Sequence, residues 1–206
     1  MRSDLLPSDQ PFLRYAREYG EYWSRRERHL YDGLADDDSA RRLQAIQSAA
    51  GYFKIARNFP TAFDISLGHA RLAPVLEIID QFRHSELTVA TLWRTIESLR
   101  IRLAAPYGGG DRLSAATKLL WLLRRDPVII YDSQARVALG APAGNYARYV
   151  QLWRLGYAKH EDAIRSACAT ISSTGTKVPE FASDTGEEWF RQRVYDIFLW
   201  NVGAPS

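Results

Sequence analysis

The residues of this chain that could carry out a reaction most directly are Lys118 and Asp132, which lie in one stretch of the sequence, 113–140. A neutral lysine amine is a nucleophile, and a carboxylate can move protons or stabilise positive charge that develops during a reaction. The pair therefore indicates covalent amine chemistry. Each residue also has an ordinary structural explanation, and the sequence leaves both explanations open.

Lys118 occupies an unusual place for a surface lysine. Ser114 is a candidate N-cap, which puts Lys118 about one turn inside the expected helix, near the end whose dipole disfavours a cation. Its helical neighbours Ala115 and Leu122 predict partly apolar surroundings for its stem. Desolvation and the dipole both predict a lowered lysine pKa and hence a nucleophilic amine. The alternative is a solvated lysine without a chemical role.

Asp132 directly precedes a helical pattern that Gly140 closes, and it is therefore a strong candidate N-cap. Capping alone explains an aspartate at this position. A catalytic role is compatible with capping, because an N-cap lies at the end of a helix, where a substrate can reach it.

The elements that must position these residues are helices. Apolar side chains recur at helical spacing along nearly the whole chain, and the apolar run Val128–Tyr131 is too short to found a sheet. The sequence therefore predicts an all-α fold of roughly eight to ten helices. The acidic run Asp36-Asp37-Asp38 is expected to start a helix, since its spacing matches no calcium-binding motif. Gly156 is expected to interrupt a later helix.

Composition bounds the class of protein. The 206 residues predict a single helical domain, or two closely packed lobes formed by about 1–84 with the C-terminal helix and by 85–171. The single cysteine, Cys168, excludes an internal disulfide and favours a cytoplasmic location, and no apolar run reaches the roughly 18 residues of a membrane span. Neither a metal nor a cofactor is predicted. A single cysteine cannot form a zinc cluster, and the four histidines lack the spacing of metal ligands (His29, His69, His84 and His160).

Basic residues are mostly arginine. The net charge is only +3. Of the 27 basic residues only four are lysines, namely Lys54, Lys118, Lys159 and Lys177. Arginine suits bidentate phosphate contacts and stacking on bases. The composition therefore permits a nucleic-acid partner without requiring one.

The central stretch resembles a known family. Ala116-Thr117-Lys118, an apolar helix and then Ile130-Tyr131-Asp132-Ser133 are similar to the helix–hairpin–helix DNA glycosylase superfamily, and most of all to its 8-oxoguanine DNA glycosylase/lyase branch. There a hairpin G-x-G-T-K ends in the nucleophilic lysine, and an aspartate opens the following helix. The pattern W-F-x-x-R-x-x-D-x-x-L-W, which starts at Trp189, resembles small divergent bacterial members of the same fold, some of them near antiviral defence genes.

The resemblance implies a two-lobed, glycosylase-like helical fold and the excision of an oxidised purine from duplex DNA. Lys118 would form the Schiff base and Asp132 would be the catalytic aspartate. Contacts with the DNA backbone are expected from Gly108, Gly109, Gly110, Arg112 and Ser114, although these glycines lie eight to ten positions before the lysine instead of adjoining it. A base pocket would involve Trp189, Trp200 and Leu122. A surface loop for the glycines and core packing for the tryptophans are the alternatives.

Two other functions stay open at this point. One is a non-catalytic module of the same fold that binds a nucleobase, a nucleotide or a partner protein, for example within a bacterial defence operon. The other is a purely structural helical protein, in which Asp132 only caps its helix. No membrane partner is expected.

Overall fold

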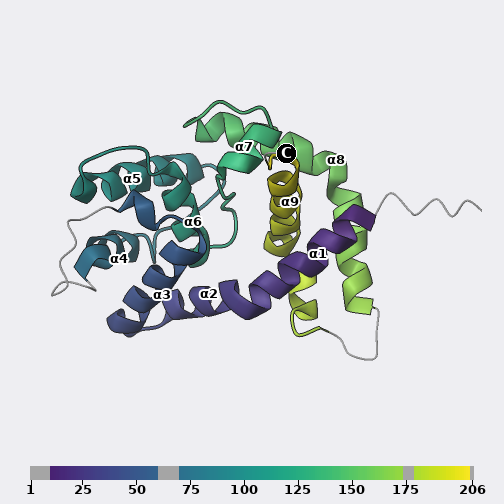
Figure 1. Ribbon diagram of the computed structural model, residues 1–206, viewed down its shortest axis with the longest axis horizontal. Coiled ribbons are helices and arrows are strands. Elements are labelled where there is room, and N and C mark those ends of the chain that lie inside the picture. Colours follow the sequence, from purple (N-terminus) through teal and green to yellow (C-terminus); the bar gives the residue numbers. More distant parts are fainter. Residues whose placement is uncertain (1–9, 60–69, 174–178, 205–206) are drawn as a thin grey trace, which may run out of the picture. The chain divides into compact units, whose positions relative to one another are not determined.

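The computed structural model describes residues 10–59, 70–173 and 179–204 (Figure 1). Within these ranges the chain forms nine α-helices, α1 to α9, with short 3-10 and π-helical turns and no strand. The predicted all-α class and the expected number of helices are therefore confirmed. The run Val128–Tyr131 is buried but stays outside any helix or sheet, as its length predicts.

The chain divides into two compact units. Unit 1 comprises the described residues of 1–26, 132–143 and 148–206, and unit 2 comprises those of 27–131 together with 144–147. The sequence suggested a division near residue 84, whereas the units change at Arg26 and Tyr131. The helices on either side of residue 84, α4 and α5, pack against each other and belong to the same unit.

Unit 2 is built around one central helix. Its helices are α2 (Arg28–Ala35), α3 (Ser39–Tyr52), α4 (Ala73–Asp80), α5 (Leu92–Ala104) and α6 (Leu113–Leu123). Helix α6 packs against α2 and α5, and α3 packs against α2 and α4. Nearly every residue of α6 is buried, from Leu113 to Leu122 with the exception of Ser114. A helix that is apolar on all sides belongs in a core, so α6 forms the centre of unit 2.

Unit 1 is organised around the C-terminal helix. Its helices are α1 (Gln10–Tyr22), α7 (Ser133–Ala138), most of α8 (Tyr146–Ser173) and α9 (Glu188–Val202). Helix α9 packs against α1 and α7. Aromatic side chains join α8 to α9, where Trp153 stacks on Tyr157 with a centroid distance of 5.0 Å and meets Tyr195 edge-on at 5.1 Å.

The expectation that Gly156 interrupts a helix is wrong, because α8 runs without a break from Tyr146 to Ser173. A Cβ atom at residue 156 would lie 2.0 Å from the hydroxyl oxygen of Tyr195. Glycine is therefore present to let the tyrosine of α9 approach the backbone of α8. The sequence suggested a helix break at Gly156, whereas the role of this glycine is to provide space for Tyr195.

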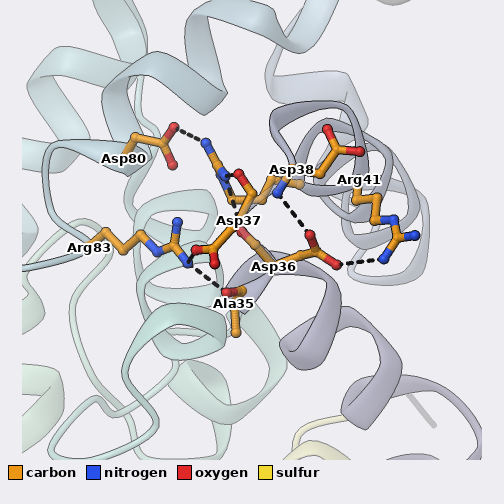
Figure 2. A network of polar contacts seen from close by, with 8 residues as sticks. Ala35, Asp36, Asp37, Asp38, Arg41, Asp80 and Arg83 are labelled. Carbon is orange, nitrogen blue, oxygen red and sulfur yellow. Dashed lines mark hydrogen bonds and ion pairs between the residues drawn. The ribbon is translucent and has the colours of Figure 1, made fainter.

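The acidic run between α2 and α3 starts a helix, as predicted. Asp38 is the N-cap of α3, and its carboxylate accepts a hydrogen bond from the backbone N–H of Ala40 at 2.9 Å. Asp36 accepts from the N–H of Asp38 at 2.8 Å, and this backbone bond, with an ion pair to Arg41, lowers the pKa of the Asp36 carboxyl. Figure 2 shows these contacts.

Arginines around the same run connect α3 and α4. Arg42 forms an ion pair with Asp80 at 2.9 Å. Arg83, just after α4, donates to the carbonyl of Ala35 at 2.6 Å, at the end of α2, and lies 3.5 Å from Asp37 (Figure 2). The acidic run therefore caps a helix and holds helix ends together.

Candidate functional site

Lys118 lies at the middle of α6 and not in its first turn. The helix begins at Leu113, whose N–H donates to the Asp111 carboxylate at 2.9 Å. The prediction that Ser114 is the N-cap is therefore wrong, because Arg112 is the N-cap residue and Ser114 lies inside the first turn. The dipole of α6 has little effect this far along the helix, since it acts mainly within the first turn.

The side chain of Lys118 is buried, with 8% of its surface exposed. Its Nζ lies 3.5 Å from the carbonyl oxygen of Phe53 and 5.9 Å from the centre of the Phe53 ring. Phe53 is the C-cap of α3, and a helix C-terminus favours a cation. The solvated-lysine alternative is therefore wrong, and the amine is held by a helix end 65 residues away in sequence.

Thr117, the residue before Lys118, anchors the segment that leads to Asp132. Its fully buried hydroxyl accepts a hydrogen bond from the backbone N–H of Tyr131 at 3.0 Å and donates to the carbonyl of Ser114 at 3.2 Å. The phenol of Tyr131 in turn accepts from the N–H of Gly144 at 3.0 Å. The threonine of the A-T-K motif thus fixes the last residue of unit 2 before the chain enters unit 1.

Asp132 is the N-cap of α7, as predicted, and its Oδ1 accepts from the N–H of Gln134 at 2.9 Å. Gly140 follows the helix with a positive φ of 61°, which glycine adopts without strain. The local pattern of the sequence therefore identified both ends of this short helix.

A buried ion pair lies near Asp132 within unit 1. Arg193 donates to the Asp196 carboxylate at 2.9 Å, and the indole N–H of Trp153 donates to its other oxygen at 2.8 Å. Burial raises the pKa of Asp196 to about 6; the charge and hydrogen bond of Arg193 and the hydrogen bond of Trp153 oppose this rise, and the charge of Asp132 adds to it. Sequence reasoning quoted Arg193 and Asp196 only as part of a pattern on α9.

The glycine loop has a conformation that requires glycine. Gly108, Gly109 and Gly110 have φ angles of 75°, 88° and 91°, a region that other residues rarely adopt. A Cβ at Gly108 or Gly109 would meet no atom within 4 Å. Arg112 folds back along the loop and donates to the carbonyl of Asp111 at 3.3 Å. The backbone conformation by itself explains the glycines, and a phosphate contact stays a prediction.

The three residues expected around a base differ in burial. Trp189 is buried in unit 1, where its ring lies 4.6 Å from that of Trp23. Leu122 is buried in unit 2, in the core around α6. Trp200, near the end of α9, has 42% of its surface exposed. Trp189 and Leu122 therefore pack in cores, and Trp200 alone of these three offers a ring to a ligand.

The predicted site residues fall into two groups. Unit 2 contains Lys118, Leu122, Ser114, Arg112 and the glycine loop, and unit 1 contains Asp132, Trp189 and Trp200. Two buried polar side chains of unit 2, Thr117 and Glu27, were given no role of their own from the sequence. The adjacency of Thr117 to the lysine was the available signal for the first. No feature of the neighbouring sequence indicates that Glu27 is buried, because it is one acidic residue in a charged stretch.

Comparison with models of protein families, with curated proteins and with solved structures gives no match to this chain. Over the described residues, no three His, Cys, Asp or Glu side chains are grouped so that they could hold a metal ion. His69 lies outside the described ranges. No helix in the described part of the chain has the length and apolar character needed to cross a membrane.

Proposed function

We propose that this chain is a DNA glycosylase/lyase-like enzyme that excises an oxidised purine through a Schiff base on Lys118. The observation that carries the proposal is the burial of the Lys118 side chain in the centre of unit 2, with its Nζ 3.5 Å from the Phe53 carbonyl oxygen. Lysine is rarely buried, because removing its charge from water is costly. Lys54 and Lys159, by contrast, are exposed. A nucleophilic amine requires this kind of sheltered and fixed position.

The reaction begins with a nucleotide turned out of the duplex, which costs a few kcal/mol and is cheaper for a damaged base. The Lys118 amine first loses a proton and then attacks C1′, and the base leaves with the electrons of the glycosidic bond. After proton transfer the sugar ring opens to a Schiff base between Nζ and C1′. Loss of a proton from C2′ then eliminates the 3′ phosphate and breaks the strand.

Asp132 acts in this scheme as a carboxylate that takes up and returns the protons of the lysine and stabilises positive charge on the sugar. Asp132 directly follows Tyr131, whose backbone N–H donates to the Thr117 hydroxyl. Each of the two proposed catalytic residues is one position from a partner in that hydrogen bond.

Duplex DNA is the proposed substrate, and the pathway is either base excision repair or bacterial antiviral defence. The arginine-rich composition supports an anionic partner. The positive-φ glycines and Arg112 would contact the backbone phosphates through N–H groups.

Trapping with borohydride tests the proposal. Wild-type protein is expected to give a covalent protein–DNA adduct with duplexes that contain 8-oxoguanine or an abasic site. Lys118→Gln is expected to abolish the adduct, and Lys159→Gln, at an exposed lysine, is the matched control. Absence of an adduct across a panel of modified duplexes would overturn the enzymatic proposal. Binding of duplex without an adduct would instead support the non-catalytic module.

A further inference from the structure

Both units bury charged side chains of opposite sign. Among the described residues of unit 1, Arg193 and Asp196 form a direct ion pair of 2.9 Å. In the described part of unit 2 the buried charged side chains are Lys118 and Glu27, and Glu27 is the more deeply buried, with 1% of its surface exposed. A carboxylate is rarely buried to this extent unless it has partners.

Glu27 lies where the helix geometry changes. It is the last residue of a π-helical turn, Trp23–Glu27, and directly precedes α2. Such turns are rare in proteins, and many of those that are known lie at functional sites. The Glu27 carboxylate accepts a hydrogen bond from the hydroxyl of Tyr52 at 3.0 Å. A hydrogen bond to a buried carboxylate is stronger than one between neutral groups. Glu27 therefore holds Tyr52, the last residue of α3.

The end of α3 connects Tyr52 to the lysine. The ring of Tyr52 meets that of Phe53 edge-on with a centroid distance of 4.8 Å. The Phe53 carbonyl accepts from the amine of Lys118, and the Phe53 ring covers the same amine. A continuous series of contacts thus leads from the buried carboxylate through two adjacent aromatic residues to Nζ.

The backbone at this point is itself fixed. Lys54 has a φ of 55°, the left-handed conformation typical of the residue after a helix C-cap. The N–H of Lys54 donates to the carbonyl of Gly51 at 3.1 Å, and that of Ile55 donates to Ala50 at 2.9 Å. These are the two bonds of a Schellman motif, and they use carbonyls other than that of Phe53. The motif and the Glu27–Tyr52 hydrogen bond together set where the Phe53 carbonyl lies.

We propose that Glu27 and Tyr52 are positioning residues for Lys118. By holding the end of α3, they fix the Phe53 carbonyl and ring that hold the amine in its place. This inference rests on the proposed function of Lys118 as the nucleophile. Lengthening or loosening the contact would leave the amine in unit 2 but would remove its fixed direction.

The first test is the single-turnover rate of adduct formation with abasic duplex, measured together with duplex affinity. Tyr52→Phe removes only the hydroxyl and is expected to slow adduct formation about tenfold, the effect of losing one hydrogen bond to a charged group. Affinity for duplex is expected to stay unchanged. Glu27→Gln keeps an acceptor oxygen but makes the bond one between neutral groups, so it is expected to slow adduct formation by less than Tyr52→Phe does. A loss with Glu27→Gln as large as with Tyr52→Phe would contradict positioning through Tyr52.

A matched control exists on α1. Tyr22 donates to Glu18 at 3.0 Å, the same pair of residue types at the same distance but at an exposed position. Tyr22→Phe is expected to change neither rate nor affinity. An effect equal to that of Tyr52→Phe would overturn the proposal.

The second test needs no DNA. Reductive methylation with formaldehyde and cyanoborohydride, followed by peptide mass spectrometry, measures the accessibility of each amine, with Lys159 as the internal reference. Tyr52→Phe is expected to raise the labelling of Lys118 about tenfold relative to Lys159, because the Phe53 cover loosens. Unchanged labelling in a folded variant would overturn the positioning role. Raised labelling without any wild-type adduct would support positioning and refute the enzymatic proposal.

Discussion

Lys118 and Asp196 are charged side chains that the fold removes from water, and each has compensating partners. Lys118 contacts the carbonyl at the end of α3, and Asp196 receives hydrogen bonds from Arg193 and Trp153. Local sequence predicted part of this. The apolar neighbours of Lys118 predicted the burial of its stem, but its contact with Phe53 joins residues far apart in the chain and has no local signal.

The first prediction concerns the pH dependence of stability. Burial raises the pKa of Asp196 from 3.8 to about 6, so the folded state holds this proton more tightly than the unfolded state. The resulting stability is present below about pH 4 and is lost as pH rises through about 6. The free energy of unfolding of wild type, minus that of Asp196→Asn, should therefore fall by about 3 kcal/mol over this window.

Urea unfolding of both proteins in steps from about pH 4 to about pH 7 measures this difference. Subtracting the Asp196→Asn values removes the contributions of groups that titrate equally in both proteins. A difference that stays constant would show that folding leaves the pKa of the Asp196 carboxyl unchanged, and one that increases with pH would show that folding lowers it; either result would contradict the prediction.

At the scale of elements, the ends of helices were predictable and the contacts between helices were not. Asp132 was identified as an N-cap and the run that contains Asp38 as a helix start, because capping depends on residues only a few positions apart. Ser114 was misassigned because α6 begins one residue earlier, at Leu113, after the N-cap residue Arg112, whose side chain makes no capping bond. Gly156 was misassigned because its reason is Tyr195 on another helix.

The two roles proposed for Asp132 can be separated by substitution. Asp132→Asn keeps an acceptor oxygen for the Gln134 N–H but removes the charge, so stability should change by less than about 0.5 kcal/mol while adduct formation is lost. Asp132→Ala also removes the cap and should lose about 1 kcal/mol. Thermal unfolding and borohydride trapping give the two readouts.

Asp38 provides the matched control, since it caps α3 in the same way and has no proposed chemical role. Asp38→Ala should lower stability by a similar amount and leave adduct formation intact. If Asp132→Asn retained full activity, Asp132 would be a cap and nothing more.

The packing of α9 against α7 makes a prediction about two glycines. A Cβ at Gly203 would lie 2.0 Å from the carbonyl oxygen of Gln134, so Gly203→Ala should destabilise the protein by about 1–3 kcal/mol. Gly51, in α3, has open space around it, and Gly51→Ala should stabilise by up to about 1 kcal/mol.

Chemical denaturation of the two variants beside wild type is the measurement. The same substitution is expected to act in opposite directions at the two sites. Equal effects at both would mean that the end of α9 does not meet α7 closely.

For the molecule as a whole, the helical spacing of apolar residues predicted the helical class, but the sequence did not predict the division into units. The change of unit at Tyr131 falls inside the stretch that the sequence treated as one site. Periodicity defines which face of a helix is buried, but it does not state which helix covers that face. The boundary near residue 84 was therefore placed at a loop that joins two packed helices, α4 and α5.

Binding to DNA makes a prediction at this scale. If arginines and the glycine loop contact phosphates, duplex affinity should fall about tenfold or more between about 50 and 200 mM salt, because bound counterions are released. Fluorescence anisotropy across a salt series gives the slope, and Arg112→Gln should reduce that slope by about one unit. Affinity that is absent at low salt, or independent of salt, would contradict a DNA partner.

The most direct test of the central claim is to identify the residue that carries the sugar in the reduced adduct. Peptide mass spectrometry after borohydride trapping on duplex with an oxidised or abasic site reports it. The account predicts that the modified peptide contains Lys118 alone. Attachment to Lys54, Lys159, Lys177 or the N-terminal amine, or no attachment at all, would contradict it.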